Sequence, residues 1–154
     1  MKTRTMILAV FVSFLVMILF GGCTKGKEIP KDLGLGTWTN EKISPQKEVD
    51  TPDGWKQYLH LADSTPLYEG TSKITSLWTD SEGNIWYKWL ATFTAPDAYK
   101  GQSITGLDKY NKSATVRESV WQSPTSDAEM KNPVYPSKID PQNPNYSIYY
   151  RAKE

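Results

Sequence analysis

Cysteine and histidine are almost missing from this sequence. Among its 154 residues there is one cysteine, Cys23, and one histidine, His60. A lone cysteine forms no intrachain disulfide and no cysteine-based metal site. A lone histidine without a second imidazole or a free thiol gives neither a metal-ligand set nor a nucleophile–base pair. We therefore expect no metal, no cofactor and no catalytic residue, which predicts a protein that is not an enzyme.

The sequence also lacks an excess of positive charge. It has 18 basic and 17 acidic side chains, and removal of residues 1–22 would leave 16 against 17, a net charge of −1. Recognition of nucleic acid depends on a basic face that neutralises phosphates. The composition therefore excludes nucleic acid as a partner. The three lysines at positions 25, 27 and 31 are suited to contact with anionic lipid headgroups.

Long hydrophobic runs are absent beyond the N-terminus. Residues 6–20 form an apolar segment interrupted only by Ser13, and Met1–Arg4 precedes it with two positive charges. The run falls short of the ~20 residues of a membrane-spanning helix. A cationic start, a short apolar run and small residues after it make up an export signal. An uncleaved signal-anchor helix is the alternative.

The stretch Leu19–Cys23 resembles the bacterial lipobox, with Gly21 and Gly22 before the cysteine and Phe20 where that pattern usually has leucine. The resemblance implies that Cys23 is diacylated on sulfur, and that the signal is then removed before it. Two or three acyl chains would anchor the protein durably in a membrane. Thr24 stands where an aspartate would retain a lipoprotein in the inner membrane. The expected location is therefore the cell envelope, and the outer membrane if the host is Gram-negative.

Three regions follow from this interpretation. Residues 1–22 are a lipoprotein signal peptide, 23–36 are the lipidated N-terminus and a glycine-containing tether, and 37–154 are one domain. All six tryptophans and all nine tyrosines lie after residue 22. Aromatic residues are enriched in strands. We expect a mainly β fold (α+β is the alternative), a small antiparallel sheet or partly closed barrel with one or two short helices.

A hairpin is the clearest element. Strand-like runs at 72–79 and 85–93 flank the turn-rich segment 80–84. Pairing about a centre between Glu82 and Gly83 predicts Trp78 opposite Tyr87. The second strand is apolar on both faces, which indicates a central strand covered on both sides.

Other elements are expected from shorter patterns. Strands are predicted at 37–39, 114–121 and 146–151, and residues 55–62 favour a strand over a helix. Residues 44–54 and the proline-rich segment 133–144 are predicted as loops. Residues 94–99 resemble a helical turn, and Ser126–Glu129 fits a capping box that starts a short helix.

The aromatic residues are the strongest indication of a binding surface. Each is more often a core residue. Yet the number of tryptophans and tyrosines exceeds what one small core needs, and these residues dominate binding hot spots. We take Trp78, Trp86, Tyr87 and Trp89 as the candidate binding surface. Its expected partner is an envelope or extracellular protein.

The acidic residues select no active site. Asp80 and Glu82 lack the ligand spacing of a calcium loop. A hydrolase that uses carboxylates alone remains a distant alternative, with nothing to select a pair among the scattered residues Asp53, Asp63, Glu118 and Asp127.

The order of motifs from Trp55 to Arg151 is similar to that of the surface-adhesin protein E family of small proteobacterial lipoproteins. The residues concerned are Trp55, Tyr68, Ser72, Ile74, the turn 80–84, Ile85 and Trp89, followed by segments 110–121 and 144–150. The resemblance implies a small antiparallel sheet with a flanking helix and, in some pathogens, adhesion to host matrix proteins. Members usually carry a cysteine pair in the later half, which this chain lacks.

We therefore predict a membrane-anchored envelope lipoprotein that acts as a non-catalytic binding or interaction module. The alternative is a lipocalin-like lipoprotein that binds a small ligand inside a barrel.

Overall fold

The structure is a computed structural model, and it describes residues 32–40, 42–43, 45–122, 125–126 and 132–153. These residues contain no helix. Their nine strands are β1 (Gly36–Thr39), β2 (Lys47–Thr51), β3 (Gly54–Tyr58), β4 (Tyr68–Thr79), β5 (Ile85–Ala95), β6 (Gln102–Tyr110), β7 (Val116–Trp121), β8 (Thr125–Ser126) and β9 (Tyr146–Arg151). The part of the chain that is described thus has no helix long and apolar enough to cross a membrane.

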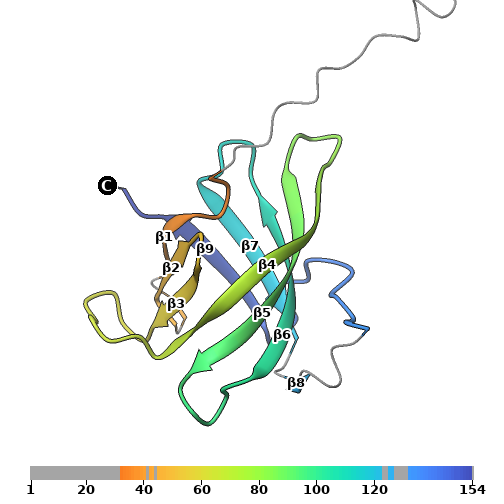
Figure 1. The fold of residues 1–154 in the computed structure, drawn as a ribbon. Coiled ribbons are helices and arrows are strands. Elements are labelled where there is room, and N and C mark those ends of the chain that lie inside the picture. The colour runs from red at the N-terminus through yellow and green to blue at the C-terminus, as the bar shows by residue number, and fades with distance from the viewer. Residues whose placement is uncertain (1–31, 41, 44, 123–124, 127–131, 154) are drawn as a thin grey trace, which may run out of the picture. The chain divides into compact units, whose positions relative to one another are not determined.

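Eight of these strands form a closed antiparallel barrel (Figure 1). Consecutive strands pair from β1 to β7, β9 pairs with both β7 and β1, and β5 pairs with both β4 and β6. The two residues of β8 add to the start of β6. The mainly β fold predicted from the sequence is confirmed, and the barrel is closed because β1 pairs with β9 and β5 pairs with β6.

Strand β5 shows why the sheet closes around a core. Its alternate residues Ile85, Tyr87, Ala91 and Phe93 are buried inside the barrel, whereas those between them are more exposed. Along β6 the outward residues Ser103, Thr105 and Leu107 are also buried, and the irregular segment around Val134 contacts this side of the strand. The Thr105 hydroxyl donates to the Val134 carbonyl at 2.7 Å across that contact. The loop predicted at 133–144 from its four prolines is confirmed.

The β4–β5 hairpin forms where it was predicted, but its register is one residue away from the predicted one. Trp78 lies opposite Trp86 instead of Tyr87, and Thr79 lies opposite Ile85. A shift of one residue exchanges the partners of every side chain in a hairpin. The two tryptophans therefore stack on each other outside the barrel, with ring centroids 6.0 Å apart and an interplanar angle of 11°.

The turn itself explains this register. The backbone N–H of Asp80 donates to the Asn84 carbonyl at 3.0 Å, which centres the loop on Glu82. The Asp80 carboxylate accepts hydrogen bonds from the backbone N–H groups of Glu82 and Asn84 at 3.0 and 2.9 Å. A second shift occurs between Ile74 and Ser76, where a β-bulge bends β4.

The sequence analysis missed two strands, β2 and β6, and several shorter elements differ from their predicted bounds or type. Segment 44–54 was predicted as a loop but contains β2, and β6 was not predicted. Strand β3 is shorter than the predicted 55–62, because residues 59–62 form bends and turns. Residues 96–100 form turns closed by hydrogen bonds such as Tyr99 N–H to the Pro96 carbonyl at 2.9 Å. The helix predicted from Ser126 lies mostly outside the described residues, and Ser126 itself belongs to β8.

The barrel wall is uneven between β3 and β4. Strand β3 pairs only with residues 68–70 of β4, so the remaining nine residues of β4 extend past it and are exposed. At this corner two glycines permit a close approach of backbones. A Cβ on Gly54 would lie 2.1 Å from the Gly70 carbonyl oxygen, and one on Gly70 would lie 2.2 Å from that of Thr92. Because β3 and β4 separate after residue 70, the barrel wall is open on this side.

Candidate functional site

The barrel encloses a cavity of about 650 Å³. This volume falls within the ~300–1,000 Å³ of small-molecule binding sites. Its lining residues come from the barrel strands other than β1 and from adjoining loops, since alternate side chains of a barrel strand point inward. The lining divides into an apolar half and a polar half.

The apolar half is an aromatic cluster at the end of the barrel where β5 finishes. Trp55, Ala91, Phe93 and Ile104 are buried there, and Tyr68, Trp89, Tyr99 and Trp121 pack against them. The rings meet edge to face, with centroids 5.2 Å apart for Trp55–Phe93 and 5.8 Å apart for Tyr68–Phe93. Such contacts favour the binding of apolar or aromatic groups.

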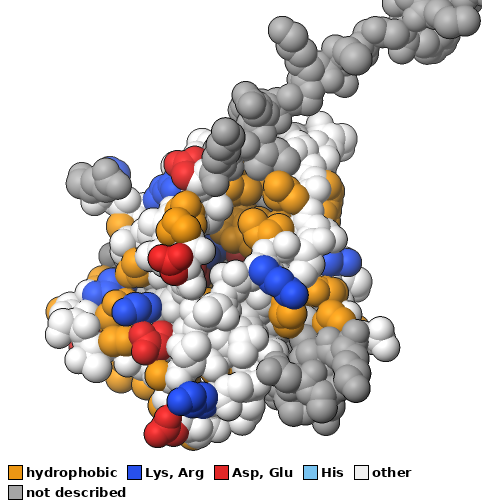
Figure 2. Space-filling model, in the orientation of Figure 1, with side chains coloured by type: hydrophobic (Ala, Val, Ile, Leu, Met, Phe, Trp, Pro, Cys, Tyr) orange, Lys and Arg blue, Asp and Glu red, His pale blue; other side chains and the backbone are white. Residues whose placement is uncertain are grey.

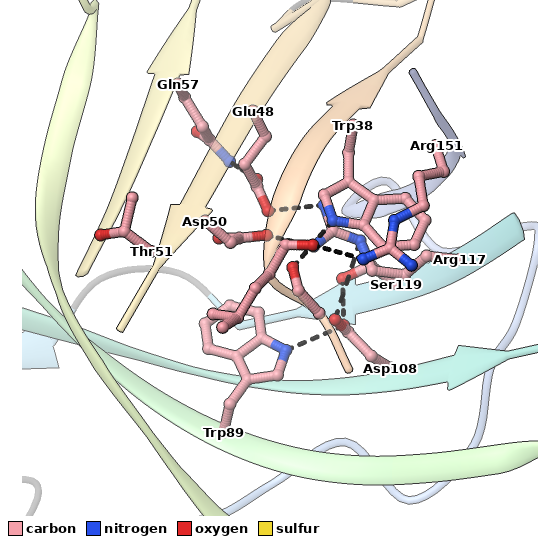
Figure 3. Close-up of polar contacts among 12 residues, drawn as sticks. Trp38, Glu48, Asp50, Thr51, Gln57, Trp89, Asp108, Arg117, Ser119 and Arg151 are labelled. Carbon is pink, nitrogen blue, oxygen red and sulfur yellow. Dashed lines mark hydrogen bonds and ion pairs between the residues drawn. The ribbon is translucent and has the colours of Figure 1, made fainter. Parts of the chain in front are cut away.

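The polar half is built around Arg117, which points into the barrel from β7 (Figure 3). Its Nη1 donates to Asp50 Oδ2 at 2.9 Å, and its Nη2 donates to Glu48 Oε1 at 2.5 Å. Its Nε lies 3.9 Å from Asp108 Oδ2. The guanidinium side chain is only 4% exposed. We call Glu48, Asp50, Asp108 and Arg117 the charged cluster.

Aromatic rings enclose the guanidinium of Arg117. Its central carbon lies 5.0 Å from the Trp38 ring centroid and 4.7 Å from that of Tyr149. Arg151 lies over the Trp38 ring as well, at 5.4 Å. Trp38 is fully buried and donates its Nε1–H to the Gly34 carbonyl at 2.8 Å. The cation is therefore held in one position by both ion pairs and cation–π contacts.

Further polar side chains connect the carboxylates of the charged cluster to the wall. Gln57 Nε2 donates to Glu48 Oε2 at 2.6 Å. Asp108 Oδ1 accepts hydrogen bonds from Trp89 Nε1 at 2.8 Å and from Ser119 Oγ at 2.6 Å. Buried carboxylates that accept several hydrogen bonds are held in defined positions.

Burial changes the acidity of this cluster. It raises the pKa of Asp50 well above its ordinary value, and the neighbouring Glu48 raises it further against the opposing effect of Arg117. It also raises the pKa of Asp108, although Arg117 and the hydrogen bonds from Ser119 and Trp89 act in the other direction. Burial alone would lower the pKa of Arg117, but the carboxylates, Glu48 first, raise it. Arg117 is thus positively charged, while ionisation of the two aspartates is costly.

A pair of tyrosines lies at the end of the barrel where β1 begins. The hydroxyls of Tyr87 and Tyr110 share a hydrogen bond inside the barrel, and burial raises both pKa values. Leu33 and Gly34, which fall in the segment expected to act as a tether, are buried beside them. A Cβ on Gly34, whose φ is +86°, would lie 2.9 Å from the Tyr87 hydroxyl. Residues 33–34 therefore belong to the packed end of the barrel.

Two buried donors in the cavity wall have no hydrogen-bond partner among the described residues: Trp55 Nε1 and Arg117 Nε. Trp55 is only 7% exposed, and it lies directly across from Asp50 in the β2–β3 pairing. Burying a donor without a partner costs free energy. The cavity wall at Asp50 and Trp55 therefore contains a buried donor that no described residue satisfies.

The cavity reaches solvent beside the open part of the wall. Its lining includes four exposed residues: Thr51 at the end of β2, Pro52 in the β2–β3 turn, and Lys73 and Ile74 in β4. Figure 2 shows hydrophobic side chains gathered in a hollow on the face between β1–β2 and the outer part of the β4–β5 hairpin. A ligand could enter between the β2–β3 turn and β4.

The structure divides the predicted binding surface between two faces of β5 and its partner β4. Tyr87 and Trp89 point into the barrel and line the cavity. Trp78 and Trp86 stack on the outside, where Trp86 Nε1 donates to Asp80 Oδ2 at 2.7 Å. The four residues therefore do not form one surface. The predicted lipid attachment residue, Cys23, lies outside the described residues.

The other residues singled out from the sequence lie away from the cavity. His60 is exposed, and its backbone N–H donates to Asp63 Oδ2 at 2.9 Å. Asp53 is exposed in the β2–β3 turn, and Glu118 pairs with Lys109 at 3.6 Å. Asp127 is outside the described residues.

Sequence reasoning missed the charged cluster entirely. A signal existed in β2, where Glu48 and Asp50 alternate with Val49 as inward and outward residues of a strand do. Their charge made the segment resemble a loop. Arg117 lies in a predicted strand, but nothing in the sequence identifies it as the inward cation.

Comparison of the chain with protein-family models, with curated proteins and with solved structures found no match.

Proposed function

We propose that this protein is a lipid-anchored envelope protein that binds a small molecule inside its barrel, without catalysing a reaction. The observation that carries the proposal is the 650 Å³ cavity, with aromatic rings on one half and a buried charged cluster on the other. Binding sites for small molecules combine mostly apolar walls with a few fixed polar groups. The cavity supports the small-ligand alternative over an interaction module that acts through its outer surface.

The charged cluster also supports binding over a purely structural role. Replacing a buried ion pair with apolar residues of similar volume is often neutral or stabilising, so such a cluster is weak evidence for stability. In this barrel it faces the cavity instead of the outer surface. A polar group held rigidly in the wall would orient a ligand without reorganising when the ligand binds.

The test is binding of a neutral, environment-sensitive dye such as N-phenyl-1-naphthylamine, followed by its fluorescence and by quenching of the tryptophans. A variant that fills the cavity, Ala91→Phe, should abolish the signal. The matched control is Leu90→Phe, at the neighbouring outward position of the same strand. Dye binding that survives Ala91→Phe, or no dye binding by the wild-type protein, would contradict the proposal.

The anchor is tested separately. Cys23→Ser should abolish labelling by radioactive palmitate and release or mislocalise the protein in cell fractionation. Unchanged labelling would rule out lipidation at this residue. Thr24→Asp would test the expected outer-membrane location in a Gram-negative host, because retention in the inner membrane is then expected.

A second candidate function is contact with an envelope or extracellular protein, as the resemblance to the adhesin family implies. Its specific support is the stacked pair of Trp78 and Trp86 on the outside of the barrel, where Trp78 is 39% exposed. Cross-linking in intact cells, with and without Trp78→Ala, tests it. Recovery of the same proteins from both strains, or of none, would contradict this function and leave ligand binding untouched.

A further inference from the structure

The chemistry of the cavity wall indicates which class of ligand fits the proposed function. The charged cluster places three carboxylates against one guanidinium in the buried wall. The other cation in the lining, Lys73, is exposed at the mouth. Buried charges are costly unless they are paired. The inner wall therefore has more acid groups than cations, and a positively charged ligand would favour the ionised form of these acids.

Arg117 is not available for an anionic ligand. Both of its Nη atoms already donate to carboxylates, and the rings of Trp38 and Tyr149 cover the guanidinium. The two-pronged hydrogen bonding that arginine offers to carboxylates and phosphates is thus already used. A fatty acid or phosphate group would also approach three acidic side chains.

Asp50 is the carboxylate best placed to meet a ligand cation. Glu48 uses both oxygens on Arg117 and Gln57, and Asp108 accepts two hydrogen bonds at Oδ1. Asp50 holds Arg117 through Oδ2 and lies beside Glu48, a group of the same charge. A cation next to Asp50 would reduce the repulsion between the two acids.

Trp55 supplies an independent observation at the same point of the wall. Trp55 lies directly across from Asp50 in the β2–β3 pairing, and only 7% of it is exposed. Its Nε1 has no hydrogen-bond partner within the described part of the chain. A hydroxyl or carbonyl oxygen on a ligand would accept this hydrogen bond. The indole ring would also attract an ammonium group through cation–π contact.

We propose that the ligand is a small organic amine, bound as an ammonium ion beside Asp50, with an apolar or aromatic body against the Trp55–Phe93 wall. An oxygen near the amine would accept the hydrogen of Trp55 Nε1. This inference rests on the proposed function, because it assigns a ligand class to the same cavity.

Three probes with the same body separate charge from shape. They are 2-amino-1-phenylethanol, 1-phenylethane-1,2-diol and 3-hydroxy-3-phenylpropanoate, which carry a cation, a neutral group and an anion beside the same hydroxyl. Binding is measured by calorimetry on the mature lipidated protein in phosphatidylcholine vesicles, with empty vesicles as the blank. The amine should bind about tenfold tighter than the diol, because a charge-assisted hydrogen bond is roughly twice as strong as a neutral one. The acid should bind weakest.

Asp50→Asn should remove this preference while keeping the shape of the side chain. The matched control is Asp53→Asn, an equal charge change on an exposed residue near the mouth, and it should alter affinity by less than about twofold because solvent screens it. Loss of preference in both variants equally would overturn the role of Asp50. If Asp50→Asn fails to fold, the three probes on the wild-type protein decide the ligand class alone.

The outcomes distinguish this inference from the proposed function. If the neutral dye binds but the diol or the acid matches the amine, the ligand class is wrong and the cavity still binds small molecules. If neither the dye nor any probe binds, the proposed function itself fails.

Discussion

The two halves of the barrel interior are built on different principles. In the apolar half, rings pack edge to face with neighbours that differ in shape, and the contacts do not depend on individual hydrogen bonds. In the polar half, each carboxylate has a particular donor. A ligand could shift several rings at modest cost, whereas moving one charged group would leave another unpaired. The apolar half provides space, and the polar half provides orientation.

Two tryptophans at the border of these halves show the difference most directly. Trp89 donates its Nε1–H to Asp108 at 2.8 Å. Trp55 has no partner for the same atom among the described residues. Both indole rings contribute apolar surface to the cavity wall, but among the described residues only the Trp89 N–H has an acceptor. Variants of these residues therefore test whether the two halves differ in energy as well as in composition.

The largest effect is expected from Arg117→Met. The substitution leaves three buried carboxylates without their cation, and removing one partner of a buried ion pair costs about 3–5 kcal/mol. Urea unfolding followed by tryptophan fluorescence measures the loss. Arg151→Met is the control, since Arg151 also stacks on Trp38 but only donates to a backbone carbonyl. Equal losses for the two variants would mean that stacking, and not charge pairing, explains the role of Arg117.

The next effect is a difference between two identical substitutions. Trp89→Phe and Trp55→Phe remove the same atoms, but only the first takes a donor away from a buried carboxylate. We expect Trp89→Phe to be more destabilising by about 1–3 kcal/mol, the cost of leaving a buried polar group unsatisfied. Thermal and urea unfolding of both variants provide the comparison. A larger loss for Trp55→Phe would contradict the distinction between the two halves.

The pH dependence of stability follows from the raised pKa values of Asp50 and Asp108. Between their unfolded pKa of about 4 and the raised folded values, the native state binds more protons than the unfolded state. These two groups therefore make stability fall as pH rises from about 4 through that window. Asp50→Asn should flatten the slope in urea unfolding measured between about pH 4 and pH 8. An unchanged slope would show that Asp50 does not titrate in this range.

The smallest effect concerns a carboxylate outside the barrel. The Asp80 carboxylate accepts hydrogen bonds from Trp86 Nε1 and from Asn84, which lower its pKa to about 2. Its contribution to stability is present above the unfolded pKa and is lost as pH falls towards about 2. NMR titration of the side-chain carbon should give this value, and Trp86→Phe should move it upwards. A pKa near 4 in the wild-type protein would contradict the hydrogen bond from Trp86.

Much of the fold could be predicted because most strands follow the usual pattern. The strands β1, β5, β7 and β9 are short runs rich in aromatic and β-branched residues, which favour strands. β2 was missed because its inward residues, Glu48 and Asp50, are charged. β6 was missed for a related reason. Its inward positions include Asp108, which lines the cavity, and Gly106, where a Cβ would meet the Trp89 ring, whereas the outward residues Ser103 and Thr105 are polar and buried.

The candidate site was less predictable than the fold. Its charged cluster joins residues from β2, β6 and β7, and no spacing along one strand connects them. Tyr87 and Trp89 were identified, but as part of a surface with Trp78 and Trp86. The register error accounts for Trp78, which was expected on the face of Tyr87 and Trp89 but lies beside Trp86. Trp86 differs in face from Tyr87 and Trp89 in either register, so grouping it with them was a separate error.

The uneven wall of the barrel has a consequence for how the protein avoids self-association. Beyond Gly70, the edge of β4 next to the opening pairs with no strand in the described residues, and Lys73 is the only charged residue in its segment 71–79. A long, weakly charged edge is a template for a strand from another molecule. The bulge between Ile74 and Ser76 interrupts the regular spacing of donors and acceptors on this strand. The extra residue at this bulge thus protects the unpaired edge of β4 from pairing with another molecule. The edge itself stays unpaired, which the opening of the cavity requires.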